Sequence, residues 1–163
     1  ALALLAPAGD LDVGPGRPRP ELLVVGGGAH RLDHLLADVA QLTSPRTEAV
    51  EVTAVLGPAT CTVVRAGRPR AVESAAGSQV SLLTPAGPAR GVSTSGLRWP
   101  LLDAELGPGS TRGVSNELLG RSGSVTVAEG VVLVVQPGTP APEVRARATP
   151  YDPSPGSAAD PAP

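Results

Sequence analysis

The sequence predicts an α+β fold in which an α/β segment is followed by an antiparallel β-sandwich. The first observation is the order of strand, glycine turn and helix over residues 21–42. The second is a change of period near residue 50, after which short Val-rich runs alternate with Gly and Pro. The third is the composition: 163 residues with no Phe or Met and a single Trp leave Val, Leu and Ala to build the core. Branched Val suits strands best, because its stiff side chain fits a pleated surface.

The amino-terminal segment, residues 1–46, is predicted to be a truncated α/β (Rossmann-like) remnant. Residues 1–6 are interpreted as the tail of a helix whose beginning is missing, and the prolines of residues 15–20 require a loop. The apolar run 21–25, stopped by three glycines, is typical of a buried parallel strand. A helix is predicted over residues 31–42, with one apolar face formed by Leu32, Leu35, Leu36, Val39 and Leu42.

Residues 47–137 are predicted to form the β-sandwich. The apolar runs that indicate its strands are residues 50–56, 60–64, 79–83, 89–94, 124–127 and 131–135. Residues 128–130 separate two of these runs and are a candidate hairpin turn. The Pro-rich tail, residues 138–163, contains few large apolar side chains and is predicted to be disordered.

Charge and cysteine content exclude several classes of function. Thirteen basic and 15 acidic residues give a net charge of −2, which offers no field to attract nucleic acid or an anionic membrane. The single Cys61 rules out an intrachain disulfide framework and a Cys-rich zinc site, and a reduced, cytoplasmic setting is the natural expectation. No apolar run approaches 18 residues, so no transmembrane helix is expected.

A first group of candidate site residues, Arg31, Asp33 and His34, follows the glycine turn. The carboxyl end of a parallel strand, next to a helix amino terminus, is where α/β sheets bind phosphates. Arg31 could hold a phosphate with its fork of donors. Asp33 could instead cap the helix, and His34 could be an ordinary polar surface residue.

A second group lies in two loops, residues 91–101 and 107–117. Both carry small hydroxyl residues, and together they include Trp99 and Asn116. Such side chains can hydrogen-bond a flat polar heterocycle, and Trp99 could stack on it or on a cation. The alternative is that these are turn residues and that Trp99 fills the core.

Three separated motifs resemble thiamine diphosphokinases (thiamin pyrophosphokinases). They are RLDH at residues 31–34, GLRWPL at residues 96–101 and GSTRGVSNE at residues 109–117, the last being the most specific. The resemblance covers roughly residues 1–137 and concerns the carboxyl-terminal portion of the family. The Ala-, Val- and Pro-rich style is similar to that of actinobacterial-type members.

The resemblance implies an enzyme that transfers diphosphate from ATP to the hydroxyl of thiamine, giving AMP and thiamine diphosphate. It also implies a homodimer whose active sites lie between subunits. Ser115, Asn116 and Trp99 would bind the thiamine pyrimidine, and Thr111 and Arg112 belong to the same predicted substrate site.

The same resemblance assigns the phosphate side to the first group. Arg31 and Asp33 would be catalytic and face the phosphates and the metal, while Arg31 and His34 would bind the ATP co-substrate. Family members hold Mg²⁺ with acidic motifs near their amino end, and this chain begins after them, so we expect the metal ligands outside it and this fragment alone to be inactive.

Two other functions remain open from the sequence. The chain could be a non-catalytic ligand-binding or regulatory module that kept the sandwich and lost the α/β chemistry. It could also be a purely structural β-sandwich, for which no binding of thiamine is expected.

Overall fold

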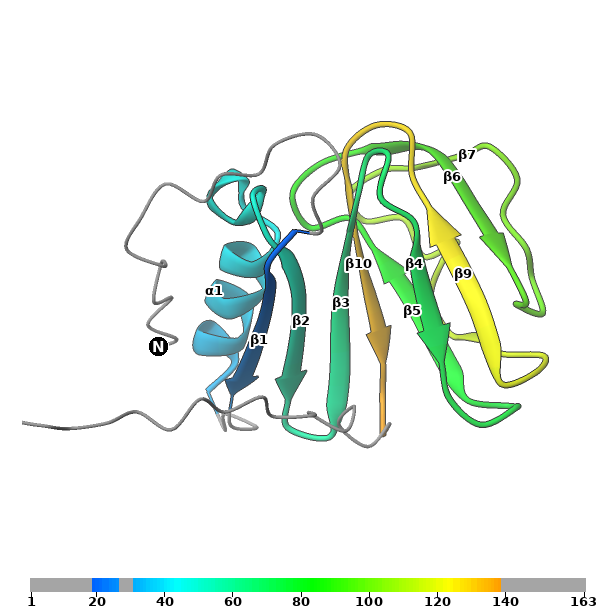
Figure 1. The fold of residues 1–163 in the computed structure, drawn as a ribbon, viewed down its shortest axis with the longest axis horizontal. Helices are drawn as coiled ribbons and strands as arrows, with labels where there is room; N and C mark the ends of the chain where they lie inside the picture. Colours follow the sequence, from blue (N-terminus) through cyan, green and yellow to red (C-terminus); the bar gives the residue numbers. More distant parts are fainter. Residues whose placement is uncertain (1–18, 27–30, 139–163) are drawn as a thin grey trace, which may run out of the picture.

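The computed structural model describes residues 19–26 and 31–138, which form two packed β-sheets and one helix that covers an outer face (Figure 1). In chain order the elements are β1 (Glu21–Gly26), α1 (Leu32–Leu42), η1 (Pro45–Thr47), β2 (Glu51–Leu56), β3 (Ala59–Arg65), β4 (Arg70–Glu73), β5 (Gln79–Leu83), β6 (Ala89–Ser95), β7 (Ala104–Leu106), β8 (Asn116–Glu117), β9 (Ser122–Thr126) and β10 (Val131–Gln136).

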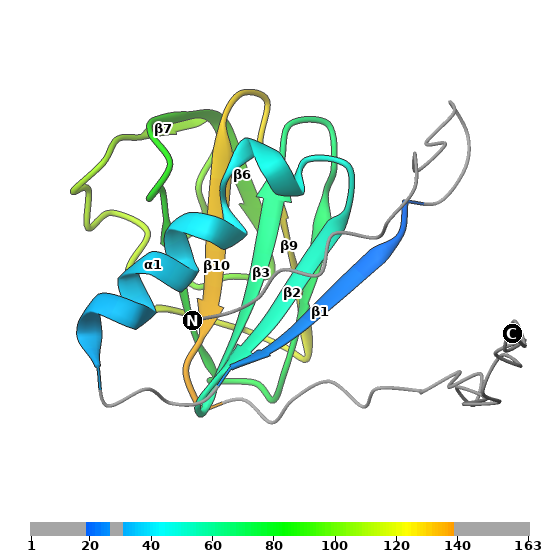
Figure 2. The same cartoon turned by 90° about the vertical axis from the view of Figure 1, so that its left-hand side faces the viewer.

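The larger sheet has six strands in the order β1-β2-β3-β10-β5-β8. β1 and β2 are parallel, with α1 as the crossover between them, and all other neighbours in this sheet are antiparallel. Figure 2 shows α1 lying across one face of this sheet. Val39 and Leu42 of α1 pack there against a cluster of strand residues: Val24, Val52, Ala54, Leu56, Cys61, Val63 and Leu133.

The smaller sheet has the order β4-β9-β6-β7 and covers the opposite face of the larger one. The side chains of β10 illustrate why both faces of the larger sheet have to be covered by other elements. Its Val132 and Val134 belong to the cluster between the sheets, whereas Leu133 belongs to the cluster beneath α1, and all three are fully buried. A strand buried on both faces is expected to be continuously apolar, as this one is.

The sequence prediction of a β-rich α+β protein with antiparallel sheets is confirmed. All six predicted sandwich strands exist, as do the strand over residues 21–25 and the helix over residues 31–42. Three short strands, β4, β7 and β8, were not predicted. Residues 139–163 of the predicted tail and the residues before Arg19 lie outside the described part of the chain. The predicted domain boundary near residue 46 stays a prediction; the ladder of hydrogen bonds runs across it from β1 to β2.

The predicted apolar face of α1 is partly wrong. Val39 and Leu42 reach the core, but Leu32 and Leu36 are 68% and 60% exposed, and Leu35 is 38% exposed. The physical reason is that the second half of α1 lies over the sheet while its first turns extend past the strands described here (Figure 2). Helical spacing identified the stripe, but it could not show how much of the stripe a sheet covers.

The predicted hairpin at residues 128–130 is wrong. β9 pairs with β4 and β6, whereas β10 pairs with β3 and β5, so the two strands lie in different sheets. The connecting residues bond to the start of β6 instead: the backbone N–H groups of Ala128 and Glu129 both donate to the Arg90 carbonyl oxygen, at 3.0 and 3.1 Å. A short Gly-containing link between two Val-rich runs is therefore a crossover between layers here.

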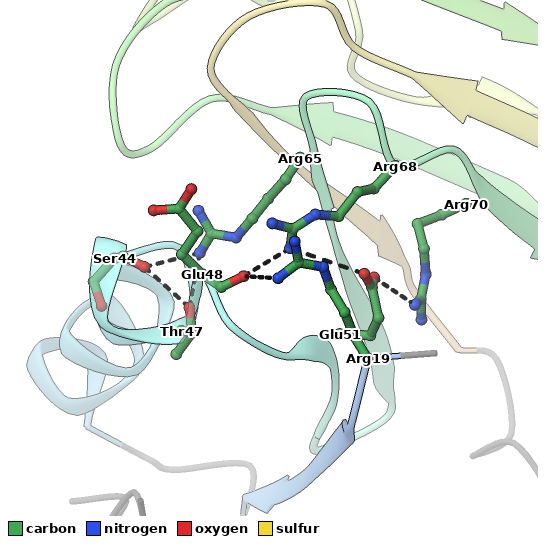
Figure 3. Close-up of polar contacts among 8 residues, drawn as sticks. All are labelled: Arg19, Ser44, Thr47, Glu48, Glu51, Arg65, Arg68 and Arg70. Carbon is green, nitrogen blue, oxygen red and sulfur yellow. Dashed lines mark hydrogen bonds and ion pairs between the residues drawn. The ribbon is translucent and has the colours of Figure 1, made fainter. Parts of the chain in front are cut away.

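Three arginines of the sandwich donate hydrogen bonds to the segment that follows α1 and to the start of β2 (Figure 3). Arg65, at the end of β3, donates to the Ser44 carbonyl oxygen and to the Thr47 hydroxyl, each at 2.8 Å. Arg68 donates to the Glu48 carbonyl oxygen at 2.7 Å, and Arg70 donates to the Glu51 carboxylate at 2.9 Å. Cations near the carboxyl end of a helix also interact favourably with its dipole.

Candidate functional site

The two loops that carry the second and third motifs lie side by side. Leu97 and Leu118 form an isolated antiparallel bridge, and both are almost fully buried. The Arg98 N–H donates to the Glu117 carbonyl oxygen at 2.8 Å. The sequence-predicted residues Trp99, Ser115 and Asn116 are thus brought to one end of the six-stranded sheet, beside β8.

Gly96 lets the first loop approach the smaller sheet this closely. Its φ is +70°, and a Cβ placed on it would lie 2.6 Å from the Ser122 carbonyl oxygen and 2.9 Å from the Gly123 Cα. Two independent constraints therefore require glycine here, the left-handed backbone and the absence of space. This glycine fixes where the residues that follow it, including Trp99, leave the sheet.

Asn116 is buried, with 3% of its surface exposed, and its side chain bonds to the backbone of Trp99. The amide oxygen accepts from the Trp99 N–H at 3.1 Å and from the Glu117 N–H at 2.9 Å. The amide nitrogen donates to the Trp99 carbonyl oxygen at 2.7 Å. A buried amide with these partners is well satisfied.

Trp99 itself is 56% exposed, so the alternative that it fills the core is wrong. The Arg98 guanidinium lies 5.7 Å from the centre of its ring, within the range of a cation–π contact. Arg98 is held there by the Glu117 carboxylate at 2.9 Å. The site therefore presents an exposed aromatic ring with a paired charge beside it.

Ser115 has a left-handed backbone, with φ of 57°, that is unusual for a residue with a side chain. Its N–H donates to the Ser81 hydroxyl on β5 at 3.0 Å. Gly113 lies against the same strand: its carbonyl oxygen accepts from the Leu82 N–H at 2.9 Å. Backbone strain of this kind costs about 1–3 kcal/mol and is concentrated at functional sites. Thr111 and Arg112, in the same loop, are both exposed.

Arg31, Asp33 and His34 lie at the start of α1, next to the carboxyl end of β1. The N-cap position is Arg31 and no side chain caps the helix, so the capping interpretation of Asp33 is wrong. The Asp33 carboxylate instead accepts from two guanidinium nitrogens of Arg31, and this contact lowers the pKa of the carboxyl group. Both side chains are largely exposed.

The two predicted groups do not come together within one chain. β1 and β8 are the outermost strands of the six-stranded sheet, with four strands between them. At a spacing of about 4.8 Å per strand, the two edge strands beside which these groups lie are roughly 24 Å apart across the sheet. One small ligand cannot touch Trp99 and Arg31 of the same copy.

The described residues contain no cluster of side chains that could by itself surround a Mg²⁺ ion. Mg²⁺ needs near-octahedral oxygen ligands, usually carboxylates with water or phosphate oxygens. Within residues 19–26 and 31–138, no group of three or more His, Cys, Asp or Glu side chains is arranged to hold a metal ion. Over the same ranges, α1 is far too short to cross a membrane and no other helix could do so.

Reasoning from the sequence missed two residues of this site, Arg98 and Glu117. Arg98 lies inside the second motif, and its position beside the only Trp could have suggested the cation–π contact. Its pairing with Glu117 could not be read from the sequence, because 19 residues separate the two and β8 was not predicted.

The fold defines a β-sandwich domain with an exposed aromatic side chain at one edge, joined to a strand–helix–strand unit. Residues 70–132 match the family model described as thiamin pyrophosphokinase, vitamin B1 binding domain. Over this segment, which is less than half of the chain, the protein is similar to the thiamin pyrophosphokinase family, and two of the three motifs, at residues 96–101 and 109–117, lie within it.

Solved structures show the same fold. The thiamine pyrophosphokinase from Bacillus subtilis has a TM-score of 0.63 at 17% identity, over 72% of this chain and 56% of that chain. The thiamin pyrophosphokinase from Geobacillus thermodenitrificans has a TM-score of 0.59 at 25% identity, over 71% and 54%. The enzyme from Candida albicans has a TM-score of 0.59 at 13% identity, over 74% and 46%. The match thus spans about half the length of these relatives, and no curated protein sequence is significantly similar to this chain.

Proposed function

We propose that this chain supplies the thiamine-binding half of a thiamine diphosphokinase, an enzyme that transfers diphosphate from ATP to thiamine. The observation that carries the proposal is the exposed Trp99 ring, whose backbone bonds to Asn116 next to the strained Ser115, in a domain that matches the vitamin B1 binding model of the family. Thiamine is a flat heterocyclic cation, the kind of ligand that an indole face binds.

The proposed roles follow from the geometry of each residue. Trp99 stacks on the pyrimidine ring, because it is the one large aromatic surface near the motif and is not used by the core. The hydroxyls of Ser115 and Thr111 hydrogen-bond the pyrimidine and its amino group. Arg112 is exposed in the same loop and is available for the phosphate oxygens of the product.

The distance between the two predicted groups supports a homodimer as part of this proposal. Arg31, Asp33 and His34 are proposed to act on the phosphates of ATP, yet they lie beside β1, an edge strand roughly 24 Å across the sheet from the edge strand beside Trp99. A second copy can bring its own phosphate-side residues to the Trp99 face of the first. The complete active site would then lie between two subunits.

We also propose that β1, α1 and β2 are the end of a Rossmann-like α/β domain. The parallel pairing of β1 with β2 across a helical crossover supports this assignment. No step of the reaction is assigned to Mg²⁺ within the described residues, because no cluster of three or more ligating side chains lies among them.

Titration calorimetry with thiamine tests the binding role. The chain is expected to bind thiamine, and Trp99→Ala is expected to weaken binding by about 1–3 kcal/mol for the lost aromatic contact. Leu36→Ala is a matched control, since Leu36 is similarly exposed, at 60%, but lies on α1 at the other end of the sheet. Unchanged affinity in Trp99→Ala would show that the proposed face is not the thiamine site.

The alternative of a non-catalytic binding module is separated by a second measurement. Both functions predict thiamine binding, but only the kinase predicts release of AMP from ATP in the presence of thiamine. The absence of a metal-ligating cluster from the described residues favours testing this on the protein with the length of its solved relatives. Binding without AMP release from that protein would favour the module.

A further inference from the structure

We infer that Asn116 is a positioning residue: its buried amide holds the backbone of Trp99 and so sets the orientation in which the exposed indole meets a ligand. The inference rests on the proposed thiamine site and adds the residue that prepares it. It differs from the sequence prediction that Asn116 binds the pyrimidine directly.

Both polar backbone groups of Trp99 bond to one side chain, that of Asn116. The Asn116 amide oxygen accepts from the Trp99 N–H, and the Asn116 amide nitrogen donates to the Trp99 carbonyl oxygen, at 3.1 and 2.7 Å. Two bonds to the same residue fix the peptide groups on either side of its Cα. The short carboxamide of Asn offers an acceptor and a donor at this separation, and Gln would place both one methylene farther from its backbone.

More than half of Trp99, 56% of its surface, is exposed, so packing within the described chain covers only part of the indole. Stacking requires offset or edge-on geometry at about 4.5–7 Å between ring centres, so a ring on a loose loop loses part of its contact energy to ordering. Holding the Trp99 backbone in advance lowers that cost.

Asn116 is also linked to the charge beside the ring. The same Asn116 oxygen accepts from the Glu117 N–H at 2.9 Å, and the Glu117 carboxylate holds Arg98 at 2.9 Å. One carboxamide therefore orders the ring and, through Glu117, the guanidinium 5.7 Å from its centre. Its oxygen already accepts two hydrogen bonds and the side chain is almost fully buried, which leaves little of it for direct contact with a ligand.

Trp99 makes the inference directly measurable, because it is the only tryptophan of the 163-residue chain. In Asn116→Ala, we expect the fluorescence anisotropy of Trp99 to fall, its quenching by acrylamide to rise, and the dissociation constant for thiamine to increase about tenfold. The control is Thr47→Val, which also removes hydrogen bonds of a buried side chain but lies at the α1 end of the sheet. It should lower the melting temperature and leave all three signals unchanged.

Asn116→Asp provides a conservative rescue. A protonated carboxyl group has one acceptor and one O–H donor, which match the oxygen and nitrogen of the amide. A carboxylate would instead direct a lone pair at the Trp99 carbonyl oxygen. We therefore expect the anisotropy of Asn116→Asp to rise toward the unsubstituted value as the pH is lowered, while the unsubstituted chain shows no such change.

The outcomes separate the inference from the proposed function. Weaker thiamine binding with unchanged Trp99 fluorescence in Asn116→Ala would mean that Asn116 touches the ligand, and the positioning role would be overturned. No change in either signal would overturn it too. If Asn116→Ala does not fold, a flat pH response of Asn116→Asp overturns the inference. If the unsubstituted chain fails to bind thiamine, the proposed function falls, and the fluorescence results still decide the role of Asn116.

Discussion

The guanidinium of Arg65 lies 2.8 Å from the hydroxyl of Thr47, although 18 residues separate them along the chain. Arg65 is 8% exposed, and its burial, together with the nearby charge of Arg68, lowers its pKa. The same guanidinium nitrogen reaches the Ser44 carbonyl oxygen. A single side chain thus joins the end of β3 to the segment that follows α1.

Arg65→Ala should therefore destabilise the protein. Loss of two charge-assisted hydrogen bonds and of the buried stem is expected to lower the free energy of unfolding by about 2–4 kcal/mol. Arg65→Met keeps the packing of the stem and should cost less, about 1–2 kcal/mol, because a desolvated charge is removed along with its bonds. Urea denaturation of both variants measures the difference, and two midpoints equal to that of the unsubstituted protein would contradict the structural role of Arg65.

Gly96→Ala should be far more damaging than Gly67→Ala. The two glycines have nearly the same left-handed φ, +70° and +68°, but a Cβ on Gly67 would meet nothing within 4 Å. Gly67→Ala thus isolates the backbone strain, about 1–2 kcal/mol. Gly96→Ala adds the clash with the backbone at Ser122 and should cost at least about 2 kcal/mol more. Thermal unfolding of the two variants tests this, and equal losses would mean that residues 96–101 approach β9 less closely than described.

Leucines on α1 differ widely in burial, so a pair of Leu→Ala variants tests how much of this helix is packed in the core. Leu42 is 1% exposed, so Leu42→Ala should lower the free energy of unfolding by about 2–5 kcal/mol. Leu36 is 60% exposed, and Leu36→Ala should change it by less than about 0.5 kcal/mol. A large loss in Leu36→Ala would show that another part of the protein buries this residue.

Because the Cys61 thiol is buried, we expect the free energy of unfolding to fall at alkaline pH. Burial raises the pKa of its thiol from 9.0 to about 11. The unfolded chain therefore releases the proton first as the pH rises. The contribution to stability is complete below pH 9 and is lost as the pH rises toward 11, by about 2 kcal/mol in total. Denaturation midpoints between pH 8 and 11 should fall less steeply for Cys61→Ala; parallel curves would contradict this assignment.

Local pattern was enough to predict the long strands of the sandwich. Period-two alternation in β2 and the apolar run in β10 both depend on side chains of the strand itself, and both were found where predicted. β8 has two residues and exists only because Asn116 and Glu117 pair with β5. Such a strand has no periodicity to detect.

The candidate site shows the same limit. The motif residues Trp99, Ser115 and Asn116 were predicted to lie together, and they do. The role of each residue depends on the hydrogen bonds between the Asn116 side chain and the Trp99 backbone. These residues are 17 positions apart in the sequence, so no local sequence pattern predicts the bonds. The hairpin prediction at residues 128–130 was wrong for a related reason, since a turn sequence does not say which sheet the next strand enters.

The continuous six-stranded sheet has a consequence for any exchange of parts between relatives. β1 and β2 pair along their whole length, from Glu21 with Glu51 to Gly26 with Leu56, so the amino-terminal unit shares its hydrogen bonds with the sandwich. In a chimaera joined near residue 46, β1 and β2 would come from different parents and would have to form these hydrogen bonds with each other. Chimaeras that retain β1 through β3 from one parent should therefore assemble more readily than those spliced between α1 and β2.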